Sequence, residues 1–246
     1  MIEQAVEIRT PDGTTEGFLY HSEDGRPRPG VLYLTDIGGI RPAQHDKARQ
    51  LAEQGYVVLM PNVFFRTGKL PLFDFKPAAG EERSMKRFAE LSGPLTPEAM
   101  ERDGSTYVDF LASHDSVRRG PLGVVGYCFS GSMAMRVAAA RPEIVAAAAS
   151  FHGGRLATDA PTSPHLTLPR IKARLYFGHA VQDRSMPEEA IAKLNGALAA
   201  WGGRYESEVY DGARHSWTEP DSPVYNPAQA RRAFEKLTQL FNETLA

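Results

Sequence analysis

The sequence has only one cysteine in 246 residues, Cys128, so an internal disulfide is excluded. A chain without disulfides fits a reducing compartment, and we expect a cytoplasmic protein. No stretch reaches the roughly 18 consecutive apolar residues of a membrane-spanning helix, and the first residues do not have the pattern of a signal peptide. Neither charge is in large excess, since 28 Lys and Arg oppose 30 Asp and Glu. We therefore expect a small-molecule partner, with no nucleic acid and no membrane.

The sequence also lacks repeats, low-complexity segments and linker-like changes of composition, which favours one domain over residues 1–246. Short apolar runs alternate with longer segments of helical spacing, a pattern typical of an α/β protein with a mostly parallel sheet and helices on both faces. The turn signal "PDG" joins the first two strands into a predicted antiparallel hairpin at one edge. Eight strands are predicted at residues 5–10, 14–20, 30–35, 56–61, 122–127, 145–151, 173–178 and 205–210, and helices at residues 42–54, 97–117, 130–141, 187–201 and 227–243.

A long excursion, residues 62–98, separates the strand at 56–61 from the helix that begins at residue 97. A segment of this length inside a compact domain is more often an active-site cover than an idle loop. We therefore expect residues 62–98 to cover the active site.

Cys128 stands in "VVGYCFSG", at the turn between a predicted buried strand and a helix. In the nucleophile elbow, G-x-nucleophile-x-G, glycines allow a sharp turn that exposes the central side chain above the sheet. Gly126 takes the first glycine position and Ser130 the second. A helix N-terminus also stabilises a thiolate. The alternative is inert packing, because free cysteine is among the most buried residue types.

A cysteine nucleophile needs a base, and the base needs an orienting acid. The order nucleophile, acid, histidine of elbow-type hydrolases selects His215, which follows the last predicted strand in "YDGARHSW". The acid is expected after the strand at 173–178, where "GHAVQDRSMP" offers Asp183. Asp211 is the competitor, although it is more typical of the turn in "DG". His152 follows another strand and is a candidate for the pocket wall.

Three of these segments, "GYCFSG", "GHAVQDRSMP" and "GARHSW", resemble the motifs of the dienelactone hydrolase family, whose members are cysteine-nucleophile α/β-hydrolases. The resemblance covers nearly the whole chain in the right order. It implies the α/β-hydrolase fold and a triad of Cys128, Asp183 and His215. It also implies an oxyanion hole formed by the backbone N–H groups of Phe129 and Ile37, the latter in "VLYLTDIGGIRP".

The sequence departs from the family pattern at three positions. Asp36 stands where the family has a glutamate beside the thiol, so Asp36 is a possible thiol neighbour. Glu219 stands four residues after the predicted base, where many members have an arginine that binds the substrate carboxylate. A negative side chain there is expected to repel an acidic substrate. Ser130 replaces the second elbow glycine.

The predicted function is hydrolysis of a small ester or lactone through an acyl-enzyme, without a metal or organic cofactor. The pocket is expected to include Trp217, His152, Phe65 and Tyr127. The alternatives are an acyl thioesterase or general carboxylesterase, a non-catalytic ligand sensor on the same fold, and redox sensing by the single thiol. No pattern in the sequence indicates an oligomeric state.

Overall fold

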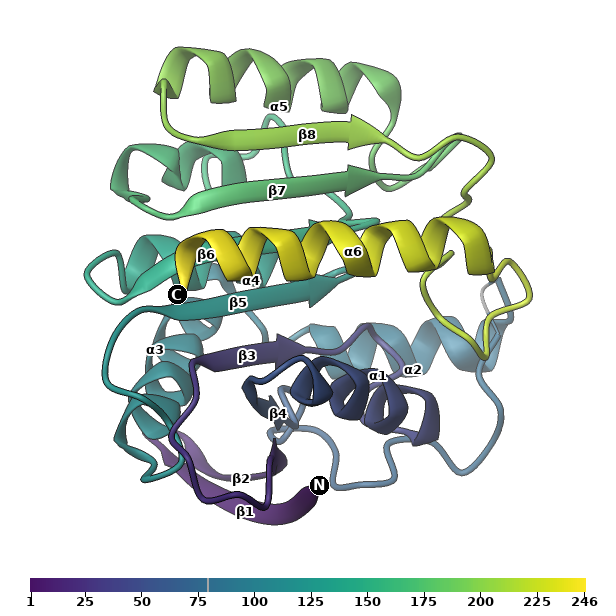
Figure 1. The fold of residues 1–246 in the computed structure, drawn as a ribbon. Coiled ribbons are helices and arrows are strands. Elements are labelled where there is room, and N and C mark those ends of the chain that lie inside the picture. Colours follow the sequence, from purple (N-terminus) through teal and green to yellow (C-terminus); the bar gives the residue numbers. More distant parts are fainter. Residues whose placement is uncertain (79) are drawn as a thin grey trace.

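One twisted sheet crosses the molecule, with its strands in the order β1-β2-β4-β3-β5-β6-β7-β8 (Figure 1). The computed structural model describes residues 1–78 and 80–246. β1 pairs antiparallel with β2, and β2 pairs antiparallel with β4, whereas the other neighbouring strands are parallel. The strands are β1 (Ile2–Thr10), β2 (Gly13–His21), β3 (Gly30–Leu34), β4 (Val57–Pro61), β5 (Leu122–Tyr127), β6 (Val145–Phe151), β7 (Arg174–His179) and β8 (Tyr205–Val209). The predicted edge hairpin is confirmed.

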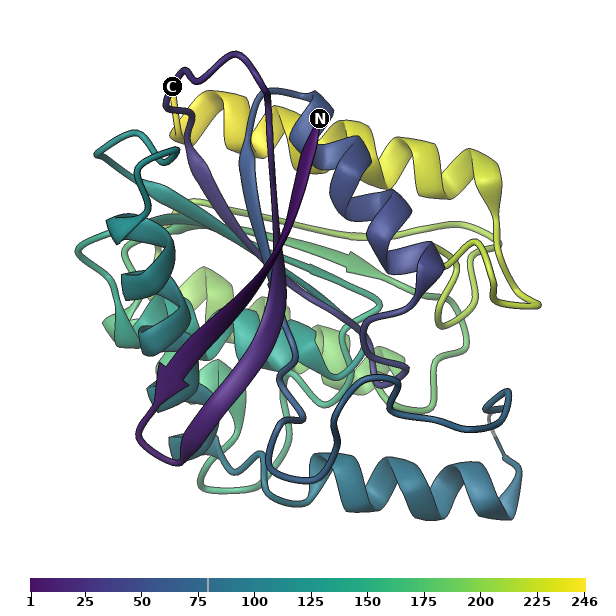
Figure 2. The same cartoon turned by 90° about the horizontal axis from the view of Figure 1, so that it is seen from below.

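Helices cover both faces of this sheet. In Figure 2, α1 and α6 lie on one face, and α3, α4 and α5 lie on the other. The helices are α1 (Pro42–Glu53), α2 (Glu82–Ser92), α3 (Pro97–Ser113), α4 (Ser130–Ala140), α5 (Glu188–Trp201), α6 (Pro227–Thr244) and a 3-10 helix, η1 (Pro164–Arg170). The prediction of a mostly parallel sheet between two helical layers is confirmed. In the described residues, no helix combines the length and the apolar character that crossing a bilayer requires.

The central strands are buried on both faces because helices cover both. Every residue of β3, β4 and β5 is buried. Alternate side chains enter separate cores: Leu32 packs with the apolar residues of α3, α4 and α5, whereas Tyr33 packs with those of α1 and α6. Fully buried parallel strands have continuous apolar runs rather than alternating ones, which made these strands visible in the sequence.

Three helical segments differ from the sequence prediction. α3 ends at Ser113 rather than at residue 117, because the N–H of Arg28 donates to the carbonyl of Ser116 and residue 117 forms a bridge with Arg28. This pairing requires an extended backbone after Ser113. The helix α2, inside the 62–98 excursion, and the 3-10 helix η1 were not predicted. The other boundaries agree within three residues.

The excursion contacts the segments that follow β3 and β5. The ring of Phe64 lies 5.3 Å from the ring of Phe129, the residue after Cys128. Leu72 lies against Gly39, where an added Cβ would come within 2.2 Å of the Leu72 side chain. Gly39 also has a positive φ of 66°, so a side chain there is disfavoured twice.

Candidate active site

Cys128 lies between β5 and α4 in a left-handed backbone conformation, with φ of 58°. A non-glycine residue in this region is strained by about 1–3 kcal/mol, and such strain is concentrated at functional sites. Gly126 allows the turn, because a Cβ at this position would lie 2.2 Å from the carbonyl oxygen of Ser130. The geometry is that of a nucleophile elbow.

Ser130 strengthens this turn although it replaces a glycine of the motif. Its side chain is fully buried, and its Oγ accepts the N–H of Tyr127 at 2.8 Å. The same hydroxyl donates to the carbonyl of Leu34 in β3, at 2.9 Å. The serine therefore ties the elbow to the neighbouring strand.

Three predicted site residues meet at this elbow. Nε2 of His215 lies 3.1 Å from Sγ of Cys128, and Nδ1 of His215 lies 2.7 Å from Oδ2 of Asp183. The other carboxylate oxygen of Asp183 accepts the N–H and the hydroxyl of Ser185, at 2.8 and 2.7 Å. Sequence reasoning missed Ser185, although a serine two residues after an aspartate is a recognisable turn signal. The competitor Asp211 is exposed in the turn after β8.

The electrostatics of the group favour a charged histidine. Burial opposes protonation of His215, but hydrogen bonds to Asp183 and Cys128 outweigh burial and raise the pKa of His215 to about 10. Burial also acts to raise the pKa of Asp183, but its hydrogen bonds to His215 and Ser185 lower it below the ordinary value. At neutral pH the site therefore holds an imidazolium between a carboxylate and a sulfur.

The free energy of unfolding should depend on pH through His215. Because the folded-state pKa is raised, the stabilising contribution is complete below the unfolded value of about 6.5. It is lost as the pH rises through about 10. Urea unfolding of the parent and of His215→Gln, at about pH 6, 8 and 10, should show a stability difference that shrinks as the pH rises. A difference that stays constant over this range would contradict the assignment.

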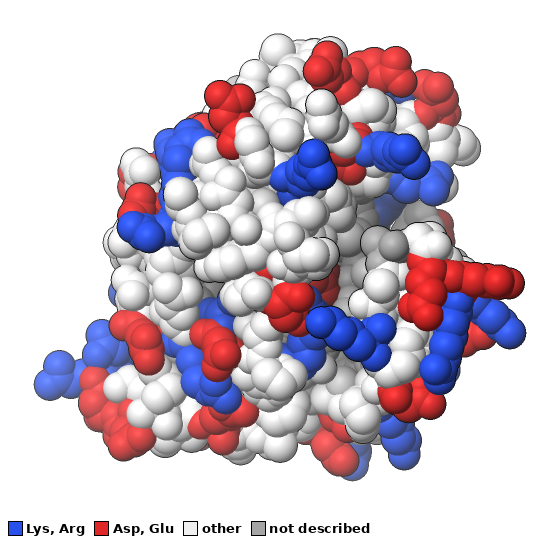
Figure 3. All heavy atoms as spheres, turned by 90° about the vertical axis from the view of Figure 1, so that its right-hand side faces the viewer, with Lys and Arg blue, Asp and Glu red and all other residues white. Residues whose placement is uncertain are grey.

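The backbone around the thiol can also receive a negative oxygen. Phe129 precedes α4, and Ile37 follows β3. Among the described residues, neither backbone N–H has a hydrogen-bond acceptor. Figure 3 looks onto the side of the molecule where the parallel strands end, and it shows a hollow with charged side chains beside it. Phe129 directly follows Cys128, and Ile37 follows β3, the strand that pairs with β5, so both N–H groups are candidates to bind a developing oxyanion.

Comparison with known proteins decides the family. A family model described as "Dienelactone hydrolase family" matches residues 15–245. The chain belongs to the dienelactone hydrolase family. This chain is 29% identical over 242 residues to the carboxymethylenebutenolidase of Rhodococcus opacus. The alignment covers 96% of this chain and 90% of the relative. The family and this relative confirm the prediction of a hydrolase of the ester or lactone type.

Solved structures show the same fold. A Klebsiella pneumoniae protein assigned to the dienelactone hydrolases has a TM-score of 0.86 at 20% identity, covering 98% of both chains. The promiscuous phosphotriesterase P91, a dienelactone hydrolase-like protein from metagenomic libraries, has a TM-score of 0.80 at 20% identity, covering 99% of this chain and 98% of that one. At these identities the likeness shows the fold alone.

Asp36, which stands at the position of the family's glutamate, forms an ion pair with Arg41. Its two carboxylate oxygens accept the guanidinium of Arg41 at 2.7 and 2.8 Å, and one also accepts the N–H of Gly38 at 2.8 Å. In the described part of the chain, Asp36 forms no hydrogen bond with Cys128. Its carboxylate oxygens are engaged by Arg41 and Gly38 instead.

Glu219, expected to repel an acidic substrate, lies in the interior of the protein. The side chain is 1% exposed, and its oxygens accept Nζ of Lys47 at 2.7 Å and Nε2 of Gln44 at 2.5 Å. Burial acts to raise the pKa of Glu219, but Lys47 outweighs burial and holds the pKa well below the ordinary value. The carboxylate is therefore paired inside the protein and is not exposed on its surface.

Two predicted pocket residues of this dienelactone hydrolase family member are inaccessible. His152 and Trp217 are each 0% exposed. The Trp217 ring meets the His152 ring edge to face at 5.1 Å and stacks on Tyr210 at 4.9 Å. Both side chains are therefore enclosed by the protein and do not form an accessible pocket wall. Phe65 is half-buried, lies under the Arg66 guanidinium and contacts the β1–β2 turn at Gly13.

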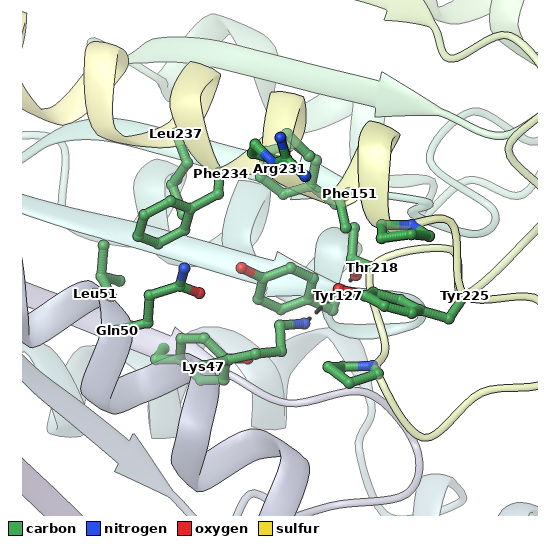
Figure 4. Close-up of a pocket in the computed structure, with 15 residues that line it drawn as sticks. Lys47, Gln50, Leu51, Tyr127, Phe151, Thr218, Tyr225, Arg231, Phe234 and Leu237 are labelled. Carbon is green, nitrogen blue, oxygen red and sulfur yellow. Dashed lines mark hydrogen bonds between the residues drawn. The ribbon is translucent and has the colours of Figure 1, made fainter.

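Tyr127 lines a separate cavity of about 230 Å³ between α1 and α6 (Figure 4). Nζ of Lys47 lies 3.6 Å from the centre of the Tyr127 ring, and Thr218 also borders this space. Cys128 and His215 do not line it. The cavity is thus distinct from the thiol site, although Tyr127 directly precedes Cys128. In the described residues, no group of three His, Cys, Asp or Glu side chains could hold a metal ion.

Proposed function

We propose that this protein hydrolyses small carboxylic esters or lactones with Cys128 as nucleophile, His215 as acid and base, and Asp183 as the group that orients His215. The observation that carries the proposal is the continuous line from Sγ through the imidazole to the carboxylate, with contacts of 3.1 and 2.7 Å, at a strained elbow. Residues 62–98 serve as the cover of this site, since Phe64 packs on Phe129.

In the first half of the reaction, the proton of the thiol resides on Nε2 of His215, and the sulfur attacks the carbonyl carbon. The carbonyl oxygen becomes negative and accepts the N–H groups of Phe129 and Ile37. When the tetrahedral intermediate collapses, the C–O bond to the leaving group breaks and His215 gives that oxygen its proton. An acyl thioester on Cys128 and an alcohol result. For a lactone, the alcohol remains attached to the acyl group.

In the second half, His215 takes a proton from water, and the hydroxide oxygen adds to the thioester carbonyl. The C–S bond breaks, the carboxylic acid leaves, and the proton on His215 again faces the sulfur. Throughout the cycle Asp183 keeps Nδ1 of His215 protonated and oriented, so that Nε2 faces Cys128.

A side-by-side assay measures the substrate class. We expect kcat/KM for an unsaturated five-membered lactone or an aryl ester to exceed kcat/KM for an acyl thioester of matched acyl group. A phosphotriester belongs in the same panel because of the structural likeness to P91. A preference for the thioester would favour the thioesterase alternative, and turnover of none of the four would favour a non-catalytic ligand sensor.

A further inference from the structure

The backbone N–H of the proposed nucleophile has an unusual acceptor. It lies 3.1 Å from Nδ1 of the His152 imidazole and 3.1 Å from the carbonyl oxygen of Phe151. His152 is fully buried, and its own backbone φ is 40°, so two adjoining turns are held in the left-handed region. No step of the proposed hydrolysis uses this histidine.

The contact with Cys128 indicates which ring nitrogen of His152 carries the proton. A nitrogen that accepts an N–H must be unprotonated, so the proton of the neutral ring is on Nε2. Nε2 lies 2.8 Å from Oγ1 of Thr218 and donates to it. The Thr218 hydroxyl in turn donates to Oε1 of Glu219 at 2.9 Å. The donors therefore run in one direction, from the Cys128 N–H to the carboxylate.

Glu219 ends this chain of hydrogen bonds, and its carboxylate is held in place by other side chains. Lys47 and Gln44 hold its two oxygens, and Nζ of Lys47 also lies 3.4 Å from Oγ1 of Thr218. Thr218 and Glu219 are 6% and 1% exposed. Because Lys47 only donates, the Thr218 hydroxyl proton is directed to Glu219 and its lone pairs are left for His152.

We propose that His152 and Thr218 are positioning residues, which set the backbone of the nucleophile through the chain Glu219–Thr218–His152–Cys128 N–H. This inference rests on the proposed function of Cys128. The wrong tautomer of His152 would point an N–H at the Cys128 N–H, and the repulsion would move the elbow. Such a movement displaces the sulfur from His215 and from the oxyanion donors, and small misplacements of reacting atoms are costly.

His152 does not act as an acid or base in this scheme. Burial lowers the pKa of His152 to about 4, so its ring is neutral at neutral pH. Its ring centre lies 5.2 Å from that of His215, edge to face, with no hydrogen bond between the two rings. His152 therefore acts on the reaction only through the backbone N–H of Cys128.

A matched pair of variants at Thr218 tests the proposal. Thr218→Val keeps the shape but removes the hydroxyl that accepts Nε2–H of His152 at 2.8 Å, which leaves Nε2 at 3.7 Å from Oε1 of Glu219, beyond hydrogen-bond distance. We expect kcat to fall about 10- to 100-fold, the size expected for one unsatisfied buried hydrogen bond, with KM changed by less than about twofold. Thr218→Ser restores the hydroxyl and should restore kcat to within about threefold of the parent.

Nitrogen-15 NMR of the histidine rings supplies a readout that general destabilisation would not move. In the parent and in Thr218→Ser, His152 should be protonated at Nε2 only, whereas Thr218→Val should populate the Nδ1–H tautomer. An unchanged kcat in Thr218→Val would overturn the proposal. A fall in kcat with an unchanged tautomer would overturn it as well.

A second pair covers the case in which Thr218→Val does not fold. His152→Asn places an amide oxygen near the position of Nδ1 and keeps a side-chain acceptor for the Cys128 N–H, whereas His152→Leu leaves it only the carbonyl oxygen of Phe151. We expect the asparagine variant to retain at least about tenfold more kcat than the leucine variant. Equal activities would overturn the proposal. Failure of the proposed function is recognised separately, because Cys128→Ala would then remain active while the tautomer experiment could still succeed.

Discussion

Cys128→Ala is expected to lower kcat/KM for an aryl ester by about 10⁴-fold or more, because no other group can form the acyl-enzyme. In the parent, Sγ lies 3.1 Å from the His215 imidazole, whose raised pKa keeps the ring charged at neutral pH. Removing the sulfur leaves only the oxyanion donors and substrate binding to accelerate attack by water. Steady-state kinetics measure the loss, and intact-protein mass spectrometry should show an acyl adduct on the parent and none on the variant.

Alanine and cysteine have the same strained backbone at residue 128, so the melting temperature of Cys128→Ala should stay close to that of the parent. Cys128→Ser adds a second control, because a hydroxyl is a much weaker nucleophile than a thiolate but still fits the turn. We expect Cys128→Ser also to lose nearly all hydrolysis while it still binds product. Parent-like hydrolysis by either variant would exclude the proposed mechanism.

Lys47→Met is expected to lower the free energy of unfolding by up to about 3–5 kcal/mol, because it removes the nearer of two cations that pair with a buried carboxylate. Glu219 is 1% exposed, and Nζ of Lys47 lies 2.7 Å from its Oε1. The second cation, Arg41, lies 3.5 Å from Oε2 and is shared with Asp36 and Asp221. The same substitution removes the ammonium from the face of Tyr127. Urea denaturation at neutral pH, followed by tryptophan fluorescence, measures the loss.

The double variant Lys47→Met, Glu219→Gln separates charge from packing. A neutral amide at residue 219 needs no cation, so most of the lost stability should return. If the single and double variants are equally unstable, the loss arises from packing of the Lys47 methylenes instead. A loss below about 1 kcal/mol in the single variant would show that the pair is as weak as an exposed one.

The sequence was informative wherever one physical requirement acts locally. β5 and β6 were predicted at their observed bounds, because a strand covered on both faces must be apolar throughout. The elbow was predictable for a similar reason, since Gly126 is required by the close approach of Ser130. The order of the three motifs along the chain then identified the histidine and aspartate that the structure brings to Cys128.

Features that depend on distant partners could not be predicted. α3 ends early because residues 116 and 117 pair with Arg28, almost ninety positions earlier in the chain. The charge of Glu219 suggested repulsion of a substrate, because a motif gives a position but not the direction of a side chain. Its actual neighbour, Lys47, comes from α1 on the same face of the sheet as α6. His152 and Trp217 were predicted in a pocket wall for the same reason, and both are buried.

The buried pair of Lys47 and Glu219 also restricts the routes by which this sequence can evolve. A single step that removes either charge leaves the other group in the interior without its nearest counter-ion, so a change at one position favours a change at the other. Since Glu219 also receives the Thr218 hydroxyl proton, a lineage that lost the pair would have to find another acceptor at the same point. We therefore expect residues 47 and 219 to covary among close homologues, with apolar or neutral pairs replacing the charged pair as a unit.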